Sequence, residues 1–210
     1  MTIKSIEWLP SLFAADPLNL SAGMDKIVNS NLNSVHLDIM DGHFVRNFSL
    51  GLNVVSAVKE RYPNVFRDVH LMLQHPEDFI QKFIQAGAQR IFIHCEIPRK
   101  SLEKSIDLLK ESGIEWGIAI NPETPLLILQ SYSYQVPIMD MHRVLLMSVY
   151  PGLSGQPFIE DTVNRVRDLH KCFPQLEICV DGGINETIAQ SLTKLGTFHF
   201  VVGSSFFNDK

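Results

Sequence analysis

The sequence predicts a (β/α)₈ TIM barrel, an α/β fold with eight parallel strands inside a ring of helices. Eight short apolar runs recur along the 210 residues and alternate with segments of helical spacing. Eight units give about 26 residues each, close to the ~200-residue lower limit of this fold. A doubly wound sheet is the alternative, but no G-x-G-x-x-G motif follows the first run. We expect residues 1–210 to form a single barrel domain.

The eight apolar runs are the predicted strands. Continuous apolar runs of this length are typical of strands buried on both faces of a parallel sheet. In chain order they cover residues 6–12, 35–39, 69–73, 91–93, 116–120, 144–149, 178–180 and 198–202.

Amphipathic segments between the strands predict the helices. The clearest are PEDFIQKFIQAGAQR, SLEKSIDLLKESG and ETIAQSLTKLG, with Gly87, Gly113 and Gly196 placed as C-terminal stops. The last unit is the weakest, because SSFFNDK after Gly203 is too short for a full eighth helix. We therefore expect a truncated last helix and a homo-oligomer that covers the apolar seam beside the first and last strands.

Composition and charge exclude several classes of protein. The chain has 45% hydrophobic and 20% charged residues, as in ordinary globular domains, and its formal net charge is -5 without any long basic run, which disfavours nucleic acid as a partner. The start MTIKSIEWLP lacks the apolar core of a leader, and no apolar run has the roughly 20 residues that cross a bilayer. Three cysteines fit neither a disulfide framework nor a zinc pattern. We expect a soluble, cytoplasmic protein that binds no membrane.

Polar residues alternate with apolar ones in two strands. In SVHLDIMDGHF, strand periodicity places His36, Asp38 and Met40 on one face. DVHLML repeats the pattern with His70 and Met72. Because polar residues near the carboxyl ends of barrel strands face the mouth, we expect them in an active site.

Asp181 ends the seventh strand in ICVDGGIN and completes a candidate His₂Asp₂ metal site with His36, Asp38 and His70. Mixed nitrogen and oxygen ligands suit Zn, Mn, Fe or Co. Taken singly, each His is more often a buried core residue and each Asp a helix cap, but four at strand ends favour a metal. His94 and Glu96 end the fourth strand, where they either support the ligands or belong to the core.

Three glycine-rich loops follow the last three strands. They are PGLSGQPF, DGGIN and VGSS. Barrels hold phosphate in the loops after strands seven and eight, where exposed backbone N–H groups approach an anion. Each loop alone could be an ordinary turn, but three in succession favour phosphate.

These motifs resemble those of the ribulose-phosphate 3-epimerase family. The similarity runs nearly end to end through PSLFAADPLNL, VHLDIMDGHFVRN, DVHLML, INPETPL, MSVYPGLSGQPFI, VDGGIN and VGSSFF. It implies a barrel of the ribulose-phosphate-binding type and an isomerase of carbohydrate metabolism, in the pentose phosphate reactions.

The resemblance also implies roles for particular residues. Asp38 and Asp181 correspond to the catalytic pair, and with His36 and His70 they correspond to the ligands of one divalent metal ion per subunit. The residues that correspond to the substrate-binding set are Ser11, Met40, His70, Met72, Met147, Gly152, Ser154, Gly155, Gly182, Gly183, Gly203 and Ser204.

The implied reaction is epimerisation at C3, which converts D-ribulose 5-phosphate to D-xylulose 5-phosphate through an enediolate. Inversion next to a ketone removes a proton on one face and returns one on the other, so two carboxylates must flank the substrate. A metal ion would stabilise the enediolate as a Lewis acid. Methionines on the ligand-bearing faces either fill the core or form a dry wall around the substrate.

Alternatives remain for the substrate and for activity itself. Tyr150, Ser154 and Arg46 depart from the residues usual in the family, so a hexulose 6-phosphate such as D-allulose 6-phosphate is the closest alternative substrate. Decarboxylation or aldol chemistry commonly uses a lysine at the barrel mouth, and no lysine follows a strand end here. A non-catalytic sugar-phosphate-binding barrel predicts loss of one carboxylate, yet both are present.

Overall fold

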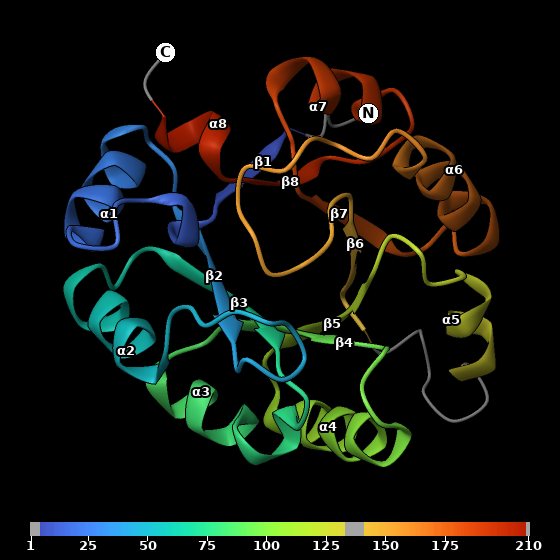
Figure 1. Cartoon of the computed structure of the whole chain (residues 1–210), viewed down its shortest axis with the longest axis horizontal. Coiled ribbons are helices and arrows are strands. Elements are labelled where there is room, and N and C mark those ends of the chain that lie inside the picture. Colours follow the sequence, from blue (N-terminus) through green and yellow to red (C-terminus); the bar gives the residue numbers. More distant parts are fainter. Residues whose placement is uncertain (1–4, 133–140, 209–210) are drawn as a thin grey trace.

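The computed structural model describes residues 5–132 and 141–208 and has eight parallel strands at its centre (Figure 1). Neighbouring strands pair in the order β1-β8-β7-β6-β5-β4-β3-β2. A single parallel bridge between Ser11 and His36 joins the end of the first strand to the second. The sheet is therefore a nearly closed barrel, and the predicted fold is confirmed.

All eight predicted strands are present. They are β1 (Glu7–Pro10), β2 (Ser34–Met40), β3 (Phe66–Met72), β4 (Arg90–His94), β5 (Glu115–Ile120), β6 (Arg143–Met147), β7 (Glu177–Asp181) and β8 (His199–Val202). Alternate residues face opposite sides, so Val35, Leu37 and Ile39 pack in the large core between sheet and helices. A smaller cluster that includes Leu9, Phe92 and Leu145 packs separately from it.

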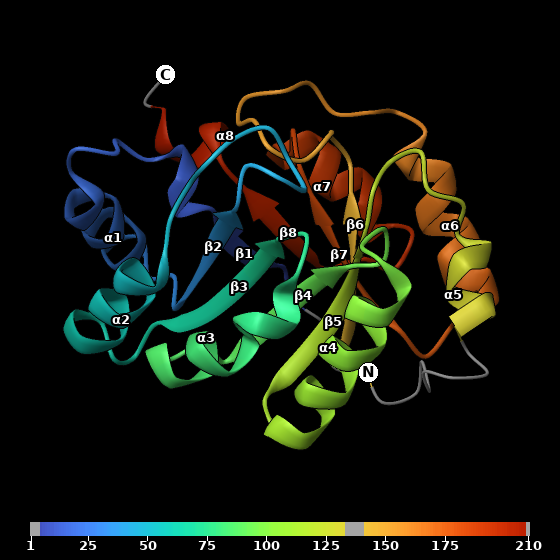
Figure 2. The ribbon, with the colours of Figure 1, turned by 60° about the horizontal axis from the view of Figure 1, so that its bottom comes forward.

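Helices surround the strands, and connecting loops gather above the strand ends (Figures 1 and 2). The helices are α1 (Leu20–Asn29), α2 (Leu52–Arg61), α3 (Ile80–Ala86), α4 (Arg99–Ser112), α5 (Leu127–Tyr132), α6 (Thr162–Cys172), α7 (Glu186–Thr193) and α8 (Ser204–Phe207), with short 3₁₀ turns at Leu12–Ala14 and Pro76–Asp78. Among the described residues, no helix has the length and apolar character needed to cross a membrane.

The three predicted helix stops are confirmed. Gly87 and Gly113 cap α3 and α4 in the left-handed conformation that glycine adopts without strain. Gly196 follows the last residue of α7, Thr193, by three positions and closes that helix end, because its φ is 94° and the N–H groups of Gly196 and Thr197 donate to the carbonyls of Thr193 and Leu192. The segment predicted as one helix from residue 76 is divided at Phe79 into a 3₁₀ turn and α3.

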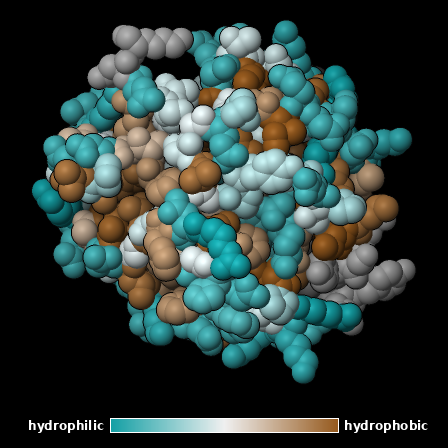
Figure 3. Space-filling model, viewed as in Figure 1, coloured by the Kyte–Doolittle hydropathy of each residue, from teal (hydrophilic) through white to brown (hydrophobic). Residues whose placement is uncertain are grey.

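The last helix is truncated, as predicted. α8 has four residues, and its Phe206 and Phe207 rings pack edge to face with centroids 4.9 Å apart. Figure 3 shows the barrel-mouth face, where hydrophobic residues gather on the α1 and α2 side and the rim is mainly hydrophilic. Exposed apolar side chains include Leu18 and Phe48.

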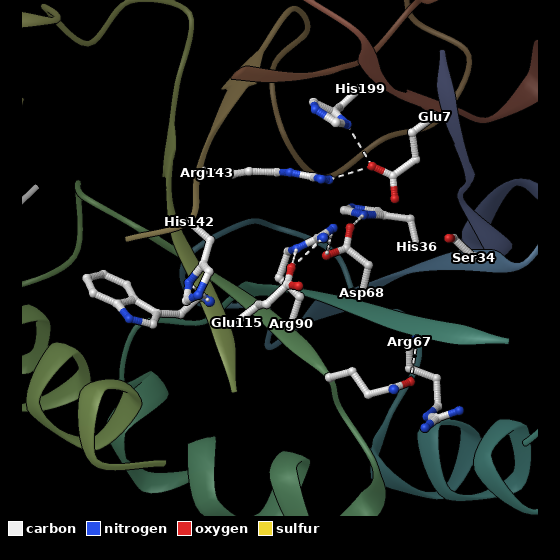
Figure 4. Close-up of polar contacts among 12 residues, drawn as sticks. Glu7, Ser34, His36, Arg67, Asp68, Arg90, Glu115, His142, Arg143 and His199 are labelled. Atoms are coloured by element: carbon white, nitrogen blue, oxygen red, sulfur yellow. Dashed lines mark hydrogen bonds and ion pairs between the residues drawn. The ribbon is translucent and has the colours of Figure 1, made fainter. Parts of the chain in front are cut away.

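Charged residues line the opposite, amino-terminal end of the barrel (Figure 4). Glu7 of β1 lies 2.7 Å from Arg143 Nη1 of β6 and 2.7 Å from His199 Nδ1 of β8. Burial alone would raise the pKa of Glu7, but these two neighbours lower it to about 2. The network therefore links β1 to β6 and β8. It adds to the backbone pairing of β1 with β8, which involves four residues of β1.

We expect Glu7→Gln to lower the free energy of unfolding by roughly 2 kcal/mol at neutral pH. Because the folded-state pKa lies below the usual value, this stabilisation is complete above about pH 4.5 and declines as the pH falls toward 2. Urea unfolding should show that the difference in unfolding free energy between the variant and wild type is smaller at pH 3.5 than at pH 7. Glu103→Gln, which removes an exposed pair with Arg99, is the control and should cost no more than about 0.5 kcal/mol. A pH-independent loss would contradict the electrostatic explanation.

Candidate active site

Strand register brings the predicted polar residues together. In the β2–β3 pair, Asp38 lies opposite His70, and Met40 lies opposite Met72. Asp181 is the last residue of β7, opposite Met147 of β6. Since all strands are parallel, these residues share the carboxyl end of the barrel.

Four side chains form a compact cluster there: His36, Asp38, His70 and Asp181. One ligand atom from each lies within 4.8 Å of the others. His36 Nε2 is 3.4 Å from Asp38 Oδ1 and 3.8 Å from Asp181 Oδ2. His70 Nδ1 is 3.1 Å and 3.8 Å from the same two oxygens.

The donor set fits a divalent cation. His36 Nε2 is buried and has no hydrogen-bond partner, although it points into the cluster. Such a nitrogen is costly to bury unless something binds it. Two imidazole nitrogens and two carboxylates around one point are ligands that Zn, Fe, Mn and Co share.

Asp68 supports His36 from below the cluster (Figure 4). His36 Nδ1 lies 2.7 Å from Asp68 Oδ2, and Arg90 Nη1 lies 3.4 Å from the other oxygen of Asp68. This contact leaves His36 Nε2 free to face the ligand site. Asp68 was not among the predicted site residues, although its position two residues before His70 places it on the same strand face.

Ser11 contacts a catalytic candidate directly. Its hydroxyl donates to Asp38 Oδ2 at 2.5 Å, and its side chain also lines the pocket above the cluster. The residue was predicted only as a substrate contact. In the structure it also holds one carboxylate oxygen in place.

The two carboxylates differ in acidity. Burial favours the neutral form of both, but His36 and His70 hold the pKa of Asp38 well below its usual range. Burial and the negative charge of Asp38 raise the pKa of Asp181 to about 7. An ionised carboxylate therefore lies beside one that exchanges its proton near neutral pH, which suits an acid/base pair.

His94 and Glu96 lie behind His70. His94 Nε2 is 2.8 Å from His70 Nε2, and His94 Nδ1 is 3.0 Å from Glu96 Oε2. Burial lowers the pKa of both histidines, that of His94 to about 4, so the two rings are neutral. Burial alone would raise the pKa of Glu96, but the hydrogen bond from His94 lowers it to about 2.

One pocket collects most of the predicted substrate-binding residues. It is lined by Ser11, Met40, Met72, Met147, Gly152, Ser154, Gly155, Gly182, Gly183, Gly203 and Ser204, together with Asp38 and Asp181. His36 and His70 lie beneath it and have no exposed surface. Phe13, Val149 and Gln156 also line the pocket and were not among the predicted residues.

Close approach of two loops requires glycine at two positions. Gly182 has φ 116°, and a Cβ there would lie 2.3 Å from Val149 Cγ2. Gly183 has φ 63°, and a Cβ there would meet Phe158 N at 2.5 Å. The DGGIN loop therefore packs directly against the segment that joins β6 to α6, which crosses the barrel mouth in Figure 2.

Comparisons with known proteins identify the family of this chain. A model of the ribulose-phosphate 3 epimerase family matches residues 7–207. The ribulose-phosphate 3-epimerase of Chlamydia muridarum (strain MoPn / Nigg) is 36% identical over 204 residues, covering 94% of this chain and 86% of that protein. The one from Aquifex aeolicus (strain VF5) is 35% identical, covering 96% and 89%.

Solved structures share the fold at low identity. The 3-hexulose-6-phosphate synthase of Salmonella typhimurium has a TM-score of 0.70 and 18% identity, covering 95% of this chain and 90% of its own. The 3-keto-L-gulonate-6-phosphate decarboxylase of Vibrio cholerae O1 biovar El Tor str. N16961 has a TM-score of 0.71 and 13% identity, covering 99% and 92%. The family model spans most of the chain, and curated relatives exceed 30% identity, so the chain belongs to the ribulose-phosphate 3-epimerase family of isomerases.

Proposed function

We propose that the protein interconverts D-ribulose 5-phosphate and D-xylulose 5-phosphate by inverting C3, as part of pentose-phosphate metabolism. The observation that carries this proposal is the pairing of Asp38 and Asp181 at the mouth of the barrel, beside two histidines that share their pocket floor. The names of the curated relatives support the same reaction.

Asp38 and Asp181 supply the two proton carriers in this proposal. One removes the C3 proton, and the other returns a proton to the opposite face. Asp181 suits the role of proton donor because its pKa lies at about 7, and Asp38 suits the role of base because it is ionised. Ser11 keeps Asp38 in place through a hydrogen bond of 2.5 Å to Oδ2, and His70 Nδ1 lies 3.1 Å from Oδ1.

His36, Asp38, His70 and Asp181 would hold one divalent metal ion per subunit, with Zn, Fe, Mn and Co all compatible. Such an ion would act as a Lewis acid on the substrate oxygens and stabilise the charge of the enediolate. The buried, unpartnered His36 Nε2 supports this assignment.

Met40, Met72 and Met147 line the pocket, and each is less than a tenth exposed. Thioether side chains bring no competing hydrogen bonds to the reacting carbon. We propose that they exclude water from the developing negative charge, which strengthens the electrostatic stabilisation of the transition state.

The substrate phosphate is proposed to bind among Gly152, Ser154, Gly155, Gly182, Gly183, Gly203 and Ser204. None of the described residues that line the pocket is a lysine or arginine. Positive potential must therefore come from backbone N–H groups, which converge well in glycine-rich loops.

We expect Gly203→Val to raise KM for the phosphorylated substrate by at least about tenfold, a cost near 1.4 kcal/mol. A Cβ at this position would lie 3.2 Å from Ala14 Cβ and 3.7 Å from Ser154 Oγ, so a branched side chain would occupy the phosphate site. Arg167→Ala on α6 is the control and should leave KM unchanged, because Arg167 contacts Asn164 on its own helix. Equal kcat/KM for ketose phosphates and their dephosphorylated sugars would contradict the phosphate assignment.

A hexulose 6-phosphate such as D-allulose 6-phosphate is the alternative candidate substrate. Tyr150 lines the pocket and donates a 2.5 Å hydrogen bond to Glu123, which links the β6–α6 and β5–α5 loops at the mouth. NMR detection of C3 epimerisation across a panel of ketose phosphates decides between the two substrates. No turnover of any member would instead favour a non-catalytic sugar-phosphate-binding barrel.

A homo-oligomer is also part of the proposal. A groove beside α8 is lined in part by the apolar side chains of Trp8, Leu32 and Phe206, which a second copy of the chain would cover. Residues 1–4 and 209–210 lie outside the described residues. We expect light scattering to give a mass that is a multiple of 23.8 kDa. A mass of one chain at working concentration would contradict the oligomer.

A cytoplasmic location completes the proposal. The three cysteines carry free thiols, as in reducing compartments, and the rice relative is named as a cytoplasmic isoform. We propose that the barrel as a whole, 1–210, is the catalytic unit.

A further inference from the structure

His94 and Glu96, which are outside the four candidate ligands, form a line of side chains that leads to His70. His94 is the last residue of β4 and has no exposed surface. Glu96 lies two residues further along and is partly buried, and it contacts His94, which in turn contacts His70. Nothing in the proposed reaction requires these two residues to touch the substrate.

The line begins at a fixed acceptor. The backbone N–H of Asn121, just beyond β5, donates to Glu96 Oε1 at 2.7 Å. Glu96 Oε2 then lies 3.0 Å from His94 Nδ1, and His94 Nε2 lies 2.8 Å from His70 Nε2. The Phe44 ring covers His94 at a centroid distance of 4.5 Å.

Counting protons gives the line a direction. His94 Nε2 and His70 Nε2 face each other at 2.8 Å, so one of them must donate and the other accept. A carboxylate can only accept, so Glu96 Oε2 accepts a hydrogen bond from His94 Nδ1–H, and His94 Nε2 then accepts from His70 Nε2–H. A proton on His70 Nδ1 instead would leave two nitrogen lone pairs facing each other at 2.8 Å.

His70 Nδ1 is therefore left with a lone pair directed at Asp38 and Asp181. His36 presents the other nitrogen, Nε2, because Asp68 binds its Nδ1. The two histidines thus enter the cluster through different nitrogens, and each is anchored by a carboxylate on its far side. For His36 the anchor is direct, whereas for His70 it acts through a second imidazole.

We propose that His94 and Glu96 are positioning residues that fix the tautomer of His70, so that its Nδ1 can bind the divalent metal ion. This inference rests on the metal site of the proposed function. In metal sites a carboxylate often accepts a hydrogen bond from the histidine that binds the metal. Here a second histidine ring, that of His94, stands between the carboxylate of Glu96 and the ligand His70.

The tautomer can be observed directly by NMR of Zn²⁺-loaded protein with ¹⁵N-labelled histidine. We expect His70 to carry its proton on Nε2 and His94 on Nδ1, with His70 signals identified by their loss in His70→Gln. A Zn²⁺-loaded protein whose His70 is protonated on Nδ1 would overturn the proposal. This measurement uses wild-type protein and does not depend on the folding of a variant.

Glu96→Gln should reverse the direction of the line. The Asn121 N–H holds the side-chain oxygen, so the substituted amide presents its NH₂ group to His94 Nδ1 as a donor. His94 must then donate from Nε2, which drives the proton of His70 onto Nδ1. We expect Co²⁺ affinity, measured by competition with a chelator, to fall by about 10- to 100-fold.

Glu103→Gln is the matched control, because it removes the same charge from the surface of α4 without touching the line. It should retain the wild-type Kd for Co²⁺, and Glu96→Asp, which keeps the carboxylate, should recover part of the loss. A wild-type Kd in folded Glu96→Gln, or an equal loss in Glu103→Gln, would overturn the proposal. Wild-type protein that epimerises without binding Co²⁺ or Zn²⁺ would overturn it and leave the reaction standing. The protein could instead show the expected tautomer and the expected change in Co²⁺ affinity but no epimerase activity. That result would support the positioning role and contradict only the proposed function.

Discussion

Asp38→Asn and Asp181→Asn are each expected to lower kcat by about 10²- to 10⁴-fold, the range that a single general acid or base contributes. The two residues act on opposite faces of C3 in the proposed reaction, so neither can replace the other. An amide retains the size and one oxygen of the carboxylate but can neither accept nor release the proton. The loss should fall on kcat more than on KM, because the substrate contacts remain.

Loss of metal is the competing explanation, since both residues are also candidate ligands. Metal content measured on the same preparations separates the two effects. We expect the residual activity per bound metal ion to remain depressed in both variants. Asp107→Asn, an exposed residue of α4, is the control and should behave as wild type.

Solvent isotope exchange gives an independent readout of the same mechanism. During wild-type turnover in D₂O, deuterium should enter C3, because the removed proton is held on a carboxylate that exchanges with solvent. Each asparagine variant should slow this incorporation in parallel with epimerisation. Turnover of wild type without any deuterium at C3 would argue against the two-carboxylate mechanism.

His70→Ala is expected to have the second large effect, a loss of metal from about one ion per chain to a small fraction. Truncation removes a ligand nitrogen from a site with four donors and should weaken binding by more than the 10- to 100-fold typical of an outer partner. His75→Ala, a nearby exposed histidine on the same segment, is the matched control. Elemental analysis after dialysis against a chelator provides the measurement.

Activity should follow metal content in this experiment. Wild-type protein stripped by a chelator is expected to lose activity and to recover it with Zn²⁺, Mn²⁺ or Co²⁺, whereas His70→Ala should recover little. Full metal occupancy in His70→Ala with activity intact would remove His70 from the site. Partial recovery at high metal concentration would agree with a weakened but surviving site.

The sequence determined the order of strands and the membership of the ligand cluster. Strand periodicity is a local property, so it placed His36 and Asp38 on one face without any knowledge of neighbours. The repeated pattern around His70 predicted a second histidine at the same height as His36, but the register pairs His70 with Asp38, two residues further along β2. Parallel strands bring all such residues to one end of the barrel.

Helix ends were less well determined. The three predicted glycine stops adopt a positive φ, but α7 ends at Thr193, three residues before Gly196, so the glycine indicates the end of a helix without fixing its last residue. The segment after His75 reads as one amphipathic helix, but its first turn is 3₁₀. Local propensity does not decide between such endings, because packing against the neighbouring strands does.

Only the tertiary structure decided which groups support the ligands and how acidic the two carboxylates are. Asp68 of β3 lies 2.7 Å from His36 of β2, and His94 of β4 lies 2.8 Å from His70 of β3, so both contacts cross between strands. The pKa difference between Asp38 and Asp181 arises from burial and from charges brought together out of β2, β3 and β7. Electrostatic interactions depend on distance in space, and sequence periodicity gives the face of a residue but not the distance to its partners.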